Sequence, residues 1–448
     1  MNIYTNRVLD FKKIKAIGFD MDYTLVRYNS KMFETMAYHE MLKKLVEIKN
    51  YPGQILEFKF DYDKVIKGLV IDKKLGNLLK LSLFGKVKKC YHGSLQLFYK
   101  DTSKIYRELS VDVREERYES IDTTFSISAS SLYLQLVDFI DSNSNLFSDY
   151  KPNYADLAMD IFQMIDLAHI DGSLKDKVKK NTEKYIIKDE NLVKVLEKLK
   201  ASGKSLQIIT NSDYHYTKLL MDYTINSFLD KNRTWLDIFD LVITQSEKPS
   251  FFTSNRKFLK VNISDASMTN HFGNLESGVF QGGNSVSVEK YLGLKGDEIL
   301  YLGDHIYGDV VTLKKSCNWR TALVVEEIAE EINAINKGQK NHEMITKLMI
   351  EKEALEQLLF KKQSDAESNA IFKKVKNIDE KISSLIVEYE KNFNKFWGPL
   401  MRAGQEPSRI ANQIERYACI YMSKVSDLID YSPRHYFRPK RRPLPHEA

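Results

Sequence analysis

The stretch KAIGFDMDYTLVRY, residues 15–28, joins a short apolar run to two carboxylates, Asp20 and Asp22. The run KAIGF has no polar alternation, which is typical of a strand covered on both faces. In an extended chain residues i and i+2 point to the same side, so both carboxylates face one spot beyond the strand end. Such a pair repels unless a cation or a proton compensates it, and an all-oxygen site of this kind suits Mg²⁺.

Four more apolar runs of the same kind follow along the chain. They are SLQIIT (205–210), FDLVIT (239–244), EILYLG (298–303) and RTALVV (320–325). Amphipathic helical patterns lie between several of them, such as NLVKVLEKLKASGK at 191–204. Strands that alternate with helices predict an α/β fold with a doubly wound, Rossmann-like parallel sheet.

The first and second runs are separated by about 180 residues, too many for one crossover connection. Within this gap LQLVDFI and YADLAMDIFQMIDLAHI have amphipathic helical patterns. We therefore expect an inserted, mostly helical cap at 85–187, between the two parts of a catalytic core at 1–84 and 188–340. From 341 to 448 we expect a C-terminal helical hairpin, because apolar residues recur at spacings of three and four, and then a basic tail.

Polar groups follow the other apolar runs, as they follow the first. Thr210 and Asn211 end the second run, Lys248 follows the third, and Asp304 and Asp309 follow the fourth. Ligands of open α/β sheets bind at the carboxyl ends of the strands, so we expect these side chains to gather there. An acidic surface turn, the other interpretation of Asp20 and Asp22, does not explain the other strand ends.

The chemistry that these groups permit is phosphoryl transfer. Asp20 can attack phosphorus to form an aspartyl-phosphate, and Asp22 can act as general acid and then general base. Thr210 and Asn211 can hold phosphoryl oxygens by hydrogen bonds, and Lys248 can offset the negative charge.

The same residues predict a metal site. Asp20, Asp22 and Asp304 are the expected Mg²⁺ ligands, and Asp309 is expected to steady the site from behind them. For Asp309 alone, a helix N-cap is an alternative role.

At this point the sequence resembles a known family. DMDYT, TNS, a Lys-Pro after the third run and GDHIYGD match the four motifs of the haloacid dehalogenase (HAD) superfamily. Longer stretches are similar to its cytosolic purine 5'-nucleotidases that prefer IMP and GMP, among them FDMDYTLVRYNS, TNSDYHYTKLLMDY and YLGDHIYGDVVTLKKSCNWRTALV. The resemblance implies Mg²⁺-dependent hydrolysis of a purine nucleoside 5'-monophosphate, with possible phosphotransfer to another nucleoside, and it implies an oligomer.

The resemblance also implies substrate-binding residues. Phe125, in DTTFSIS, corresponds to a base-stacking residue, and Asp166, His169 and Lys175 correspond to cap residues that meet the substrate. Ser212, in the TNS motif, is expected to contact the substrate too. In isolation, a residue like Phe125 is usually part of the core and one like Lys175 is usually a solvated charge at a helix end.

Three positions depart from the animal members of the family. Phe162 stands where the family has Arg, Ile170 where it has Tyr, and Ser126 where it has Asn. These departures leave the predicted chemistry intact and leave the base preference open. The basic C-terminal end replaces an acidic tail, so the effectors are open as well.

Composition limits the remaining classes of function. The chain has 448 residues, 43% hydrophobic content and a net charge of +6. No run of 18 or more apolar residues is present, and no single face is basic, so we expect neither a membrane span nor nucleic-acid binding. Three widely spaced cysteines outside any CxxC pair are typical of a reducing compartment, so we expect a cytoplasmic protein, and the resemblance implies that it is a homo-oligomer.

Two other functions stay open from the residues. A phosphatase of the same superfamily with a non-nucleotide substrate would show no purine dependence. A non-catalytic nucleotide-binding module would lack Asp20 or Asp22, and both are present.

Overall fold

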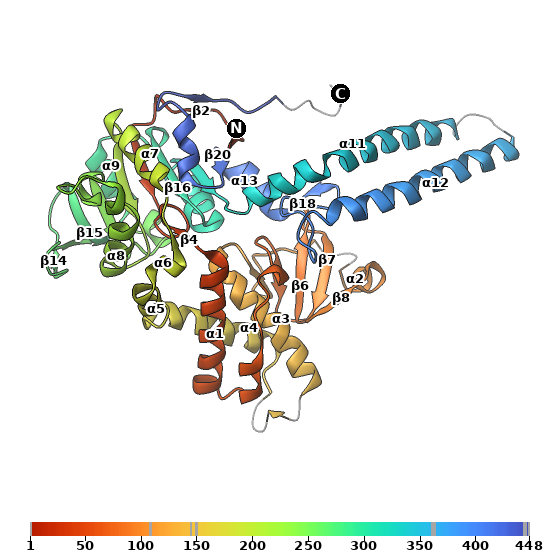
Figure 1. The fold of residues 1–448 in the computed structure, drawn as a ribbon, viewed down its shortest axis with the longest axis horizontal. Coiled ribbons are helices and arrows are strands. Elements are labelled where there is room, and N and C mark those ends of the chain that lie inside the picture. The colour runs from red at the N-terminus through yellow and green to blue at the C-terminus, as the bar shows by residue number, and fades with distance from the viewer. Residues whose placement is uncertain are drawn as a thin grey trace.

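The protein is built on a ten-stranded central sheet (Figure 1). The computed structural model describes residues 2–106, 110–143, 146–147, 151–359, 364–441 and 446. In spatial order the strands are β1 (Ile3–Thr5), β20 (Ile420–Met422), β17 (Arg320–Val324), β16 (Ile299–Gly303), β3 (Ala16–Phe19), β11 (Ser205–Ile209), β12 (Leu241–Thr244), β15 (Gly278–Gly282), β13 (Phe258–Val261) and β14 (Met268–Asn270). Neighbours from β20 to β15 are parallel, and β1, β13 and β14 pair antiparallel at the edges.

Both faces of the parallel sheet are covered, as apolar runs without polar alternation require. Ile17 and Leu300 pack into one cluster with side chains of α7 (Glu190–Ala201) and α8 (Tyr214–Thr224). Tyr301, one residue on, packs into a second cluster with α9 (Ser285–Leu292) and α10 (Thr312–Ser316). The predicted doubly wound α/β sheet is therefore confirmed, and all five apolar runs are strands of it.

An inserted unit follows β3 and combines helices with a second sheet. Its helices α1 (Ser30–Lys49), α3 (Ile127–Ser142) and α4 (Tyr154–Ile170) pack on one another. The remaining elements are α2 (Tyr99–Tyr106), α5 (Lys175–Lys180), α6 (Thr182–Tyr185) and an antiparallel sheet of β8 (Leu95–Leu97), β7 (Val87–His92), β6 (Asn77–Leu81), β5 (Val70–Asp72) and β9 (Tyr118–Ser120). The two chain segments that join the unit to the core, β4 (Arg27–Tyr28) and β10 (Ile186–Ile187), pair as an antiparallel ribbon.

The expected start of the cap at residue 85 needs correction. That position lies between β6 and β7, which are hydrogen-bonded neighbours, so a boundary there would divide the second sheet. Because β5 also pairs with β9, the segment 51–80 belongs with the inserted unit and not with the core. The unit is consequently larger and less purely helical than its amphipathic segments predicted.

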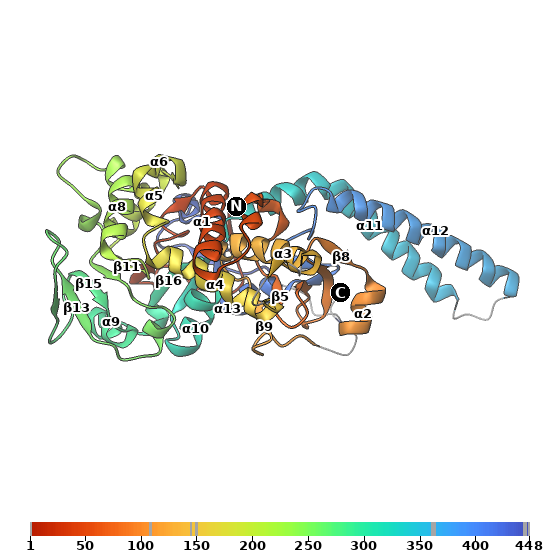
Figure 2. The ribbon, with the colours of Figure 1, turned by 90° about the horizontal axis from the view of Figure 1, so that it is seen from below.

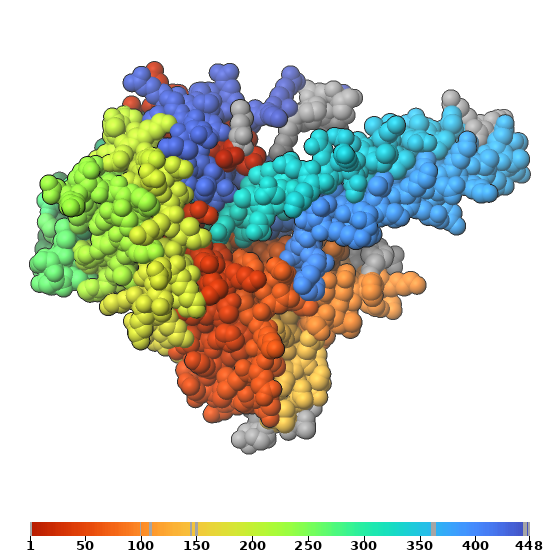
Figure 3. Space-filling view, in the orientation of Figure 1, coloured from red at the N-terminus to blue at the C-terminus, as the bar shows by residue number. Residues whose placement is uncertain are grey.

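The expected C-terminal hairpin is formed by α11 (Ile328–Leu358) and α12 (Asp365–Glu390). The two helices run side by side and project from the body of the protein as an arm (Figures 2 and 3). No helix in the described ranges is both long and apolar enough to cross a membrane.

The expected boundary at residue 341 also needs correction, because it lies inside α11. After the arm the chain returns to the body through β18 (Arg402–Ala403), β19 (Glu406–Pro407) and α13 (Arg409–Tyr417). It then adds β20 to the central sheet and pairs β21 (Tyr436–Phe437) with β2 (Leu9–Asp10). Elements between residues 402 and 437, within the segment expected as a hairpin and tail, therefore belong to the body of the protein, and residues 442–445, 447 and 448 lie outside the described residues.

Ile208→Ala should lower the free energy of unfolding by about 2–5 kcal/mol, because it leaves a cavity in the center of a packed core. Ile208 is 0% exposed in β11, whereas Ile350 on the arm is 65% exposed and provides the matched control. Urea unfolding followed by circular dichroism measures both variants. An Ile350→Ala variant as unstable as Ile208→Ala would contradict this account of the core.

Candidate active site

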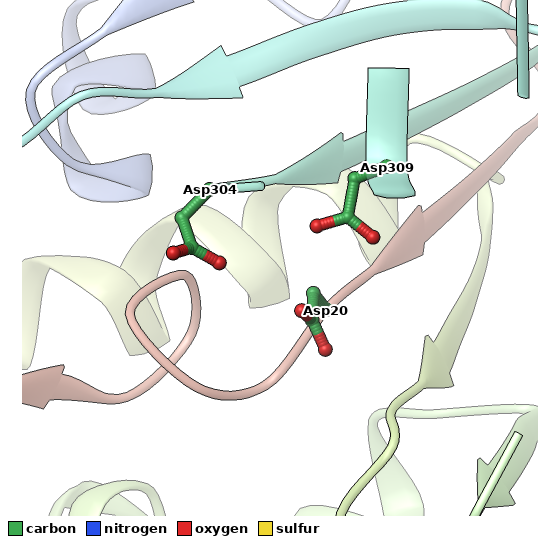
Figure 4. A group of neighbouring side chains, drawn as sticks. All are labelled: Asp20, Asp304 and Asp309. Carbon is green, nitrogen blue, oxygen red and sulfur yellow. The ribbon is translucent and has the colours of Figure 1, made fainter. Parts of the chain in front are cut away.

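Three carboxyl groups meet at the carboxyl edge of the central sheet. Asp20 follows β3, Asp304 follows β16, and Asp309 lies in a short π-helix, η9 (Ile306–Val311). Figure 4 shows their side chains gathered in one place, and one oxygen of each lies within 4.8 Å of the others. The predicted convergence of Asp20 and Asp304 is thus present in the structure.

Lys248 supplies positive charge to this cluster. Its Nζ lies 2.9 Å from Asp20 Oδ2 and 2.9 Å from Asp309 Oδ1, and it donates a hydrogen bond to the hydroxyl of Tyr301. The side chain of Lys248 is only 4% exposed. Burial alone would lower the pKa of Lys248, but the charges of Asp20 and Asp309 raise it well above its ordinary value, so the ammonium stays charged.

Asn211 holds the main chain of Lys248. Its Nδ2 donates to the carbonyl oxygen of Lys248 at 3.0 Å, and its Oδ1 accepts from the amide of Lys248 at 2.7 Å. Its Oδ1 also accepts from the hydroxyl of Ser246 at 3.0 Å. The sequence predicted that Asn211 would hold phosphoryl oxygens, whereas the structure uses its amide group to position Lys248.

Burial raises the pKa of two carboxyl groups of the cluster, Asp20 and Asp304. It raises the pKa of Asp20 to about 7, an effect that Lys248 opposes and that Asp309 and Asp22 reinforce. Burial, together with the charges of Asp20 and Asp309, raises the pKa of Asp304 well above its ordinary value. One ammonium does not balance these carboxyl groups, so the site favours a further cation or a proton.

Asp22 occupies a different place from the one expected. Its Oδ1 accepts a hydrogen bond of 2.6 Å from Tyr28, and its Oδ2 accepts one of 2.7 Å from Ser212. Among the described residues the metal-competent group contains Asp309 where Asp22 was expected. Burial raises the pKa of Asp22, which suits a group that must hold a proton.

The surroundings of Asp22 contain residues that sequence reasoning missed. Tyr28, from the ribbon strand β4, also hydrogen-bonds the hydroxyl of Tyr216 at 3.0 Å. The Ser212 hydroxyl, expected to contact substrate, instead donates to Asp22, and its amide donates to Thr210 Oγ1 at 3.1 Å. Thr210 Oγ1 therefore accepts locally and keeps its own proton to donate, as its predicted role requires.

Asp309 braces the cluster. Its Oδ2 accepts from the amide of His305 at 3.2 Å while its Oδ1 faces Lys248. The alternative of an N-cap role is wrong, because Asp309 lies inside η9 and His305 caps that helix. Gly303 has to be a glycine, since a Cβ there would lie 2.3 Å from Asp309 Oδ2.

The inserted unit brings a set of aromatic rings to the same region. Phe125 contacts His169 edge to face, with ring centroids 5.0 Å apart, and also contacts Tyr23, the residue after Asp22, at 4.8 Å. His169 Nε2 is buried and has no hydrogen-bond partner among the described residues. Burial lowers the pKa of His169 to about 4, so its ring is neutral at physiological pH.

The other two predicted substrate-binding residues, Lys175 and Asp166, differ in where they lie relative to the clustered aspartates. Lys175 Nζ donates to Asp213 Oδ2 at 2.5 Å, and its charge opposes the rise in the pKa of Asp22 that burial causes, so it lies close to the catalytic edge. Asp166 lines a cavity of about 960 Å³ together with Phe162. None of the three clustered aspartates is among the described residues that line this cavity.

Comparison with known proteins gives the following similarities. Residues 3–448 match the sequence profile described as the 5' nucleotidase family. A 5'-nucleotidase domain-containing protein of Dictyostelium discoideum is 27% identical over 456 residues, which cover 100% of this chain and 75% of that protein.

Solved structures resemble the chain more distantly. A predicted phosphoglycolate phosphatase from Haemophilus somnus has a TM-score of 0.31 and 13% identity, covering 70% of this chain and 86% of its own. An archaeal β-phosphoglucomutase from Pyrococcus sp. has a TM-score of 0.32 and 10% identity, with 70% and 87% covered.

The free energy of unfolding in EDTA should fall as the pH rises from about 5 to about 8, and Asp20→Asn should reduce this fall. The pKa of Asp20 is about 7 in the folded protein and is lower in the unfolded chain, so the folded state binds the extra proton. The stability that this proton contributes is lost as the pH rises through the folded pKa. Urea unfolding at several pH values measures it, and an identical pH dependence in both proteins would argue against a strained carboxyl at this position.

Proposed function

Because the chain belongs to the 5' nucleotidase family over residues 3–448, we propose that it hydrolyses purine nucleoside 5'-monophosphates through an aspartyl-phosphate, with Mg²⁺ as cofactor. The observation that carries this proposal is the contrast between two aspartates on one loop. Asp20 lies 2.9 Å from the ammonium of Lys248, whereas Asp22 accepts hydrogen bonds from the hydroxyls of Tyr28 and Ser212. Burial raises the pKa of both carboxyl groups, but the ammonium of Lys248 beside Asp20 favours its anion, whereas Asp22 lies among hydroxyl groups and can carry a proton, so the two are suited to different roles.

The proposed reaction has two steps. The Asp20 carboxylate attacks phosphorus, the bond from phosphorus to the 5'-oxygen breaks, and Asp22 gives its proton to that oxygen. A water then attacks the aspartyl-phosphate, Asp22 takes the proton, and the bond to Asp20 breaks to release phosphate. The hydroxyl of Thr210 donates to the phosphoryl group, and Lys248 balances the charge that gathers there.

The residues at the sheet edge fit a magnesium ion. Asp20, Asp304 and Asp309 provide oxygen atoms within 4.8 Å of one another, and oxygen donors are those that Mg²⁺ prefers. Lys248 forms ion pairs with Asp20 and Asp309, whereas Lys67 and Lys248 offset the charge of Asp304 only in part, and the pKa of Asp304 stays well above its ordinary value. When bound, the ion would supply charge compensation for the phosphoryl oxygens.

The base would lie at the aromatic rings of the inserted unit. Phe125 offers a ring for stacking, and His169 offers a buried ring nitrogen, Nε2, that has no hydrogen-bond partner among the described residues. A buried polar atom without a partner is costly, so a ligand that hydrogen-bonds Nε2 gains what the free protein lacks. Departures at Phe162, Ile170 and Ser126 leave the choice among purines to experiment.

Phosphate release should be measured over all nucleoside 5'-monophosphates and over ribose 5-phosphate, with Mg²⁺ and with EDTA. We expect release from purine nucleotides that EDTA abolishes, because the carboxylate cluster needs a compensating cation. Equal turnover of ribose 5-phosphate would favour a phosphatase of another substrate class. No turnover of any ester would favour a non-catalytic nucleotide-binding module.

Asp20→Asn should fold normally and release no phosphate, because an amide cannot form the acyl-phosphate bond. Thr210→Ala should reduce the rate by roughly 10²–10³, the usual effect of losing one donor to a developing charge. Asp230→Asn, an exposed position on the same core, serves as the control. Wild-type turnover by Asp20→Asn would refute the assignment of the nucleophile.

A further inference from the structure

Glu34 is a fully buried carboxyl group that the proposed reaction does not use. It lies in the second turn of α1 and is 0% exposed. Burial raises its pKa to about 7, against the effect of hydrogen bonds from Ser128 and Tyr23 and of the charge of Lys67. An isolated buried carboxyl group is costly, so its contacts explain why this position tolerates one.

The first contact is with the start of α3. The amide of Ser128, in the first turn of this helix, donates to Glu34 Oε2 at 3.0 Å. The N-cap residue of α3, Ser126, makes no side-chain capping bond. Glu34, on α1, thus accepts a hydrogen bond from one of the free amides in the first turn of α3. A negative charge at this end of α3 also interacts favourably with the helix dipole.

The position of this cap matters because of what precedes it. Phe125 lies three residues before Ser128, in the 3₁₀ turn η3 (Thr124–Ser126) that leads into α3. Glu34 Oε1 also faces the hydroxyl of Tyr23 at 3.5 Å, and the ring of Tyr23 contacts Phe125. The neighbour of Glu34 in α1, Phe33, contacts both Phe125 and His169.

We propose that Glu34 is a positioning residue that sets nucleotide affinity by fixing Phe125 against the base. It joins the loop that carries Asp22 to the start of α3, so that the ring of Phe125 has one orientation before the substrate arrives. This inference rests on the proposed function, in which Phe125 stacks on the base. Glu34 touches neither the phosphoryl group nor the clustered aspartates, so its effect belongs to binding and not to the chemical steps.

The test compares substrates with and without a base. Glu34→Ala should raise KM for the best nucleoside 5'-monophosphate about threefold to tenfold and change kcat by less than about twofold. For ribose 5-phosphate, which has neither a purine nor an aromatic ring, kcat/KM should not change. Glu34→Gln, which keeps the volume and one acceptor, should lie between Glu34→Ala and the wild type.

A double-mutant cycle tests whether Glu34 acts through Phe125. In a Phe125→Ala background, Glu34→Ala should add little further loss of affinity, because the ring that it positions is gone. Glu40→Gln is the matched control, since Glu40 is a buried glutamate of the same helix that pairs with Lys177. If Glu34→Ala does not fold, Glu34→Gln enters the same cycle.

Calorimetric binding of the nucleotide to Asp20→Asn protein, with and without Glu34→Ala, gives a readout that is independent of turnover. Losses that add in the cycle, or an equal loss with ribose 5-phosphate, would overturn the proposal for Glu34. A wild-type protein that neither binds nor hydrolyses any nucleotide would instead refute the proposed function, and this is seen before any Glu34 variant is made.

Discussion

The burial of Lys248 among carboxylates is the interaction on which the site depends. Removing either Asp20 or Asp309 would leave a buried ammonium undercompensated, and removing Lys248 would leave the carboxylates to repel one another. The surroundings therefore hold this one side chain from several directions. Asn211 fixes its main chain, and Tyr301 accepts from its Nζ while donating to the carbonyl of Ile209 in β11. Tyr301, which helps to position the Lys248 side chain, thus also joins two strands of the central sheet.

Much of this arrangement could be predicted from the sequence, for a specific reason. Five apolar runs identify buried parallel strands, and parallel strands deliver whatever follows them to one edge. This reasoning brought Asp20, Lys248 and Asp304 together correctly. It failed for Asn211, because a residue type that can bind phosphate can equally bind main chain, and only the fold decides which partner is nearer.

The remaining errors concern contacts between segments that are distant in sequence. The hairpin of β5 and β6 looks like a local feature, and its assignment to the inserted unit depends on β7 and β9. The sequence assigns no role to Tyr28 or Glu34, because their roles come from contacts with residues on α8 and α3. The return of residues 402–437 to the core was invisible for the same reason, since the strand β20 is too short to form a recognisable pattern.

The ribbon of β4 and β10 has a consequence for how such enzymes diversify. The segments that leave and re-enter the core are hydrogen-bonded neighbours, so the inserted unit is joined to the core like a loop whose two ends lie side by side. Lengthening such a loop costs little entropy. Mutation can therefore change the inserted unit, to which we assign the base of the substrate, without opening the sheet that carries the aspartate cluster. In this way a core of one kind can acquire new substrate specificities through changes in the inserted unit alone.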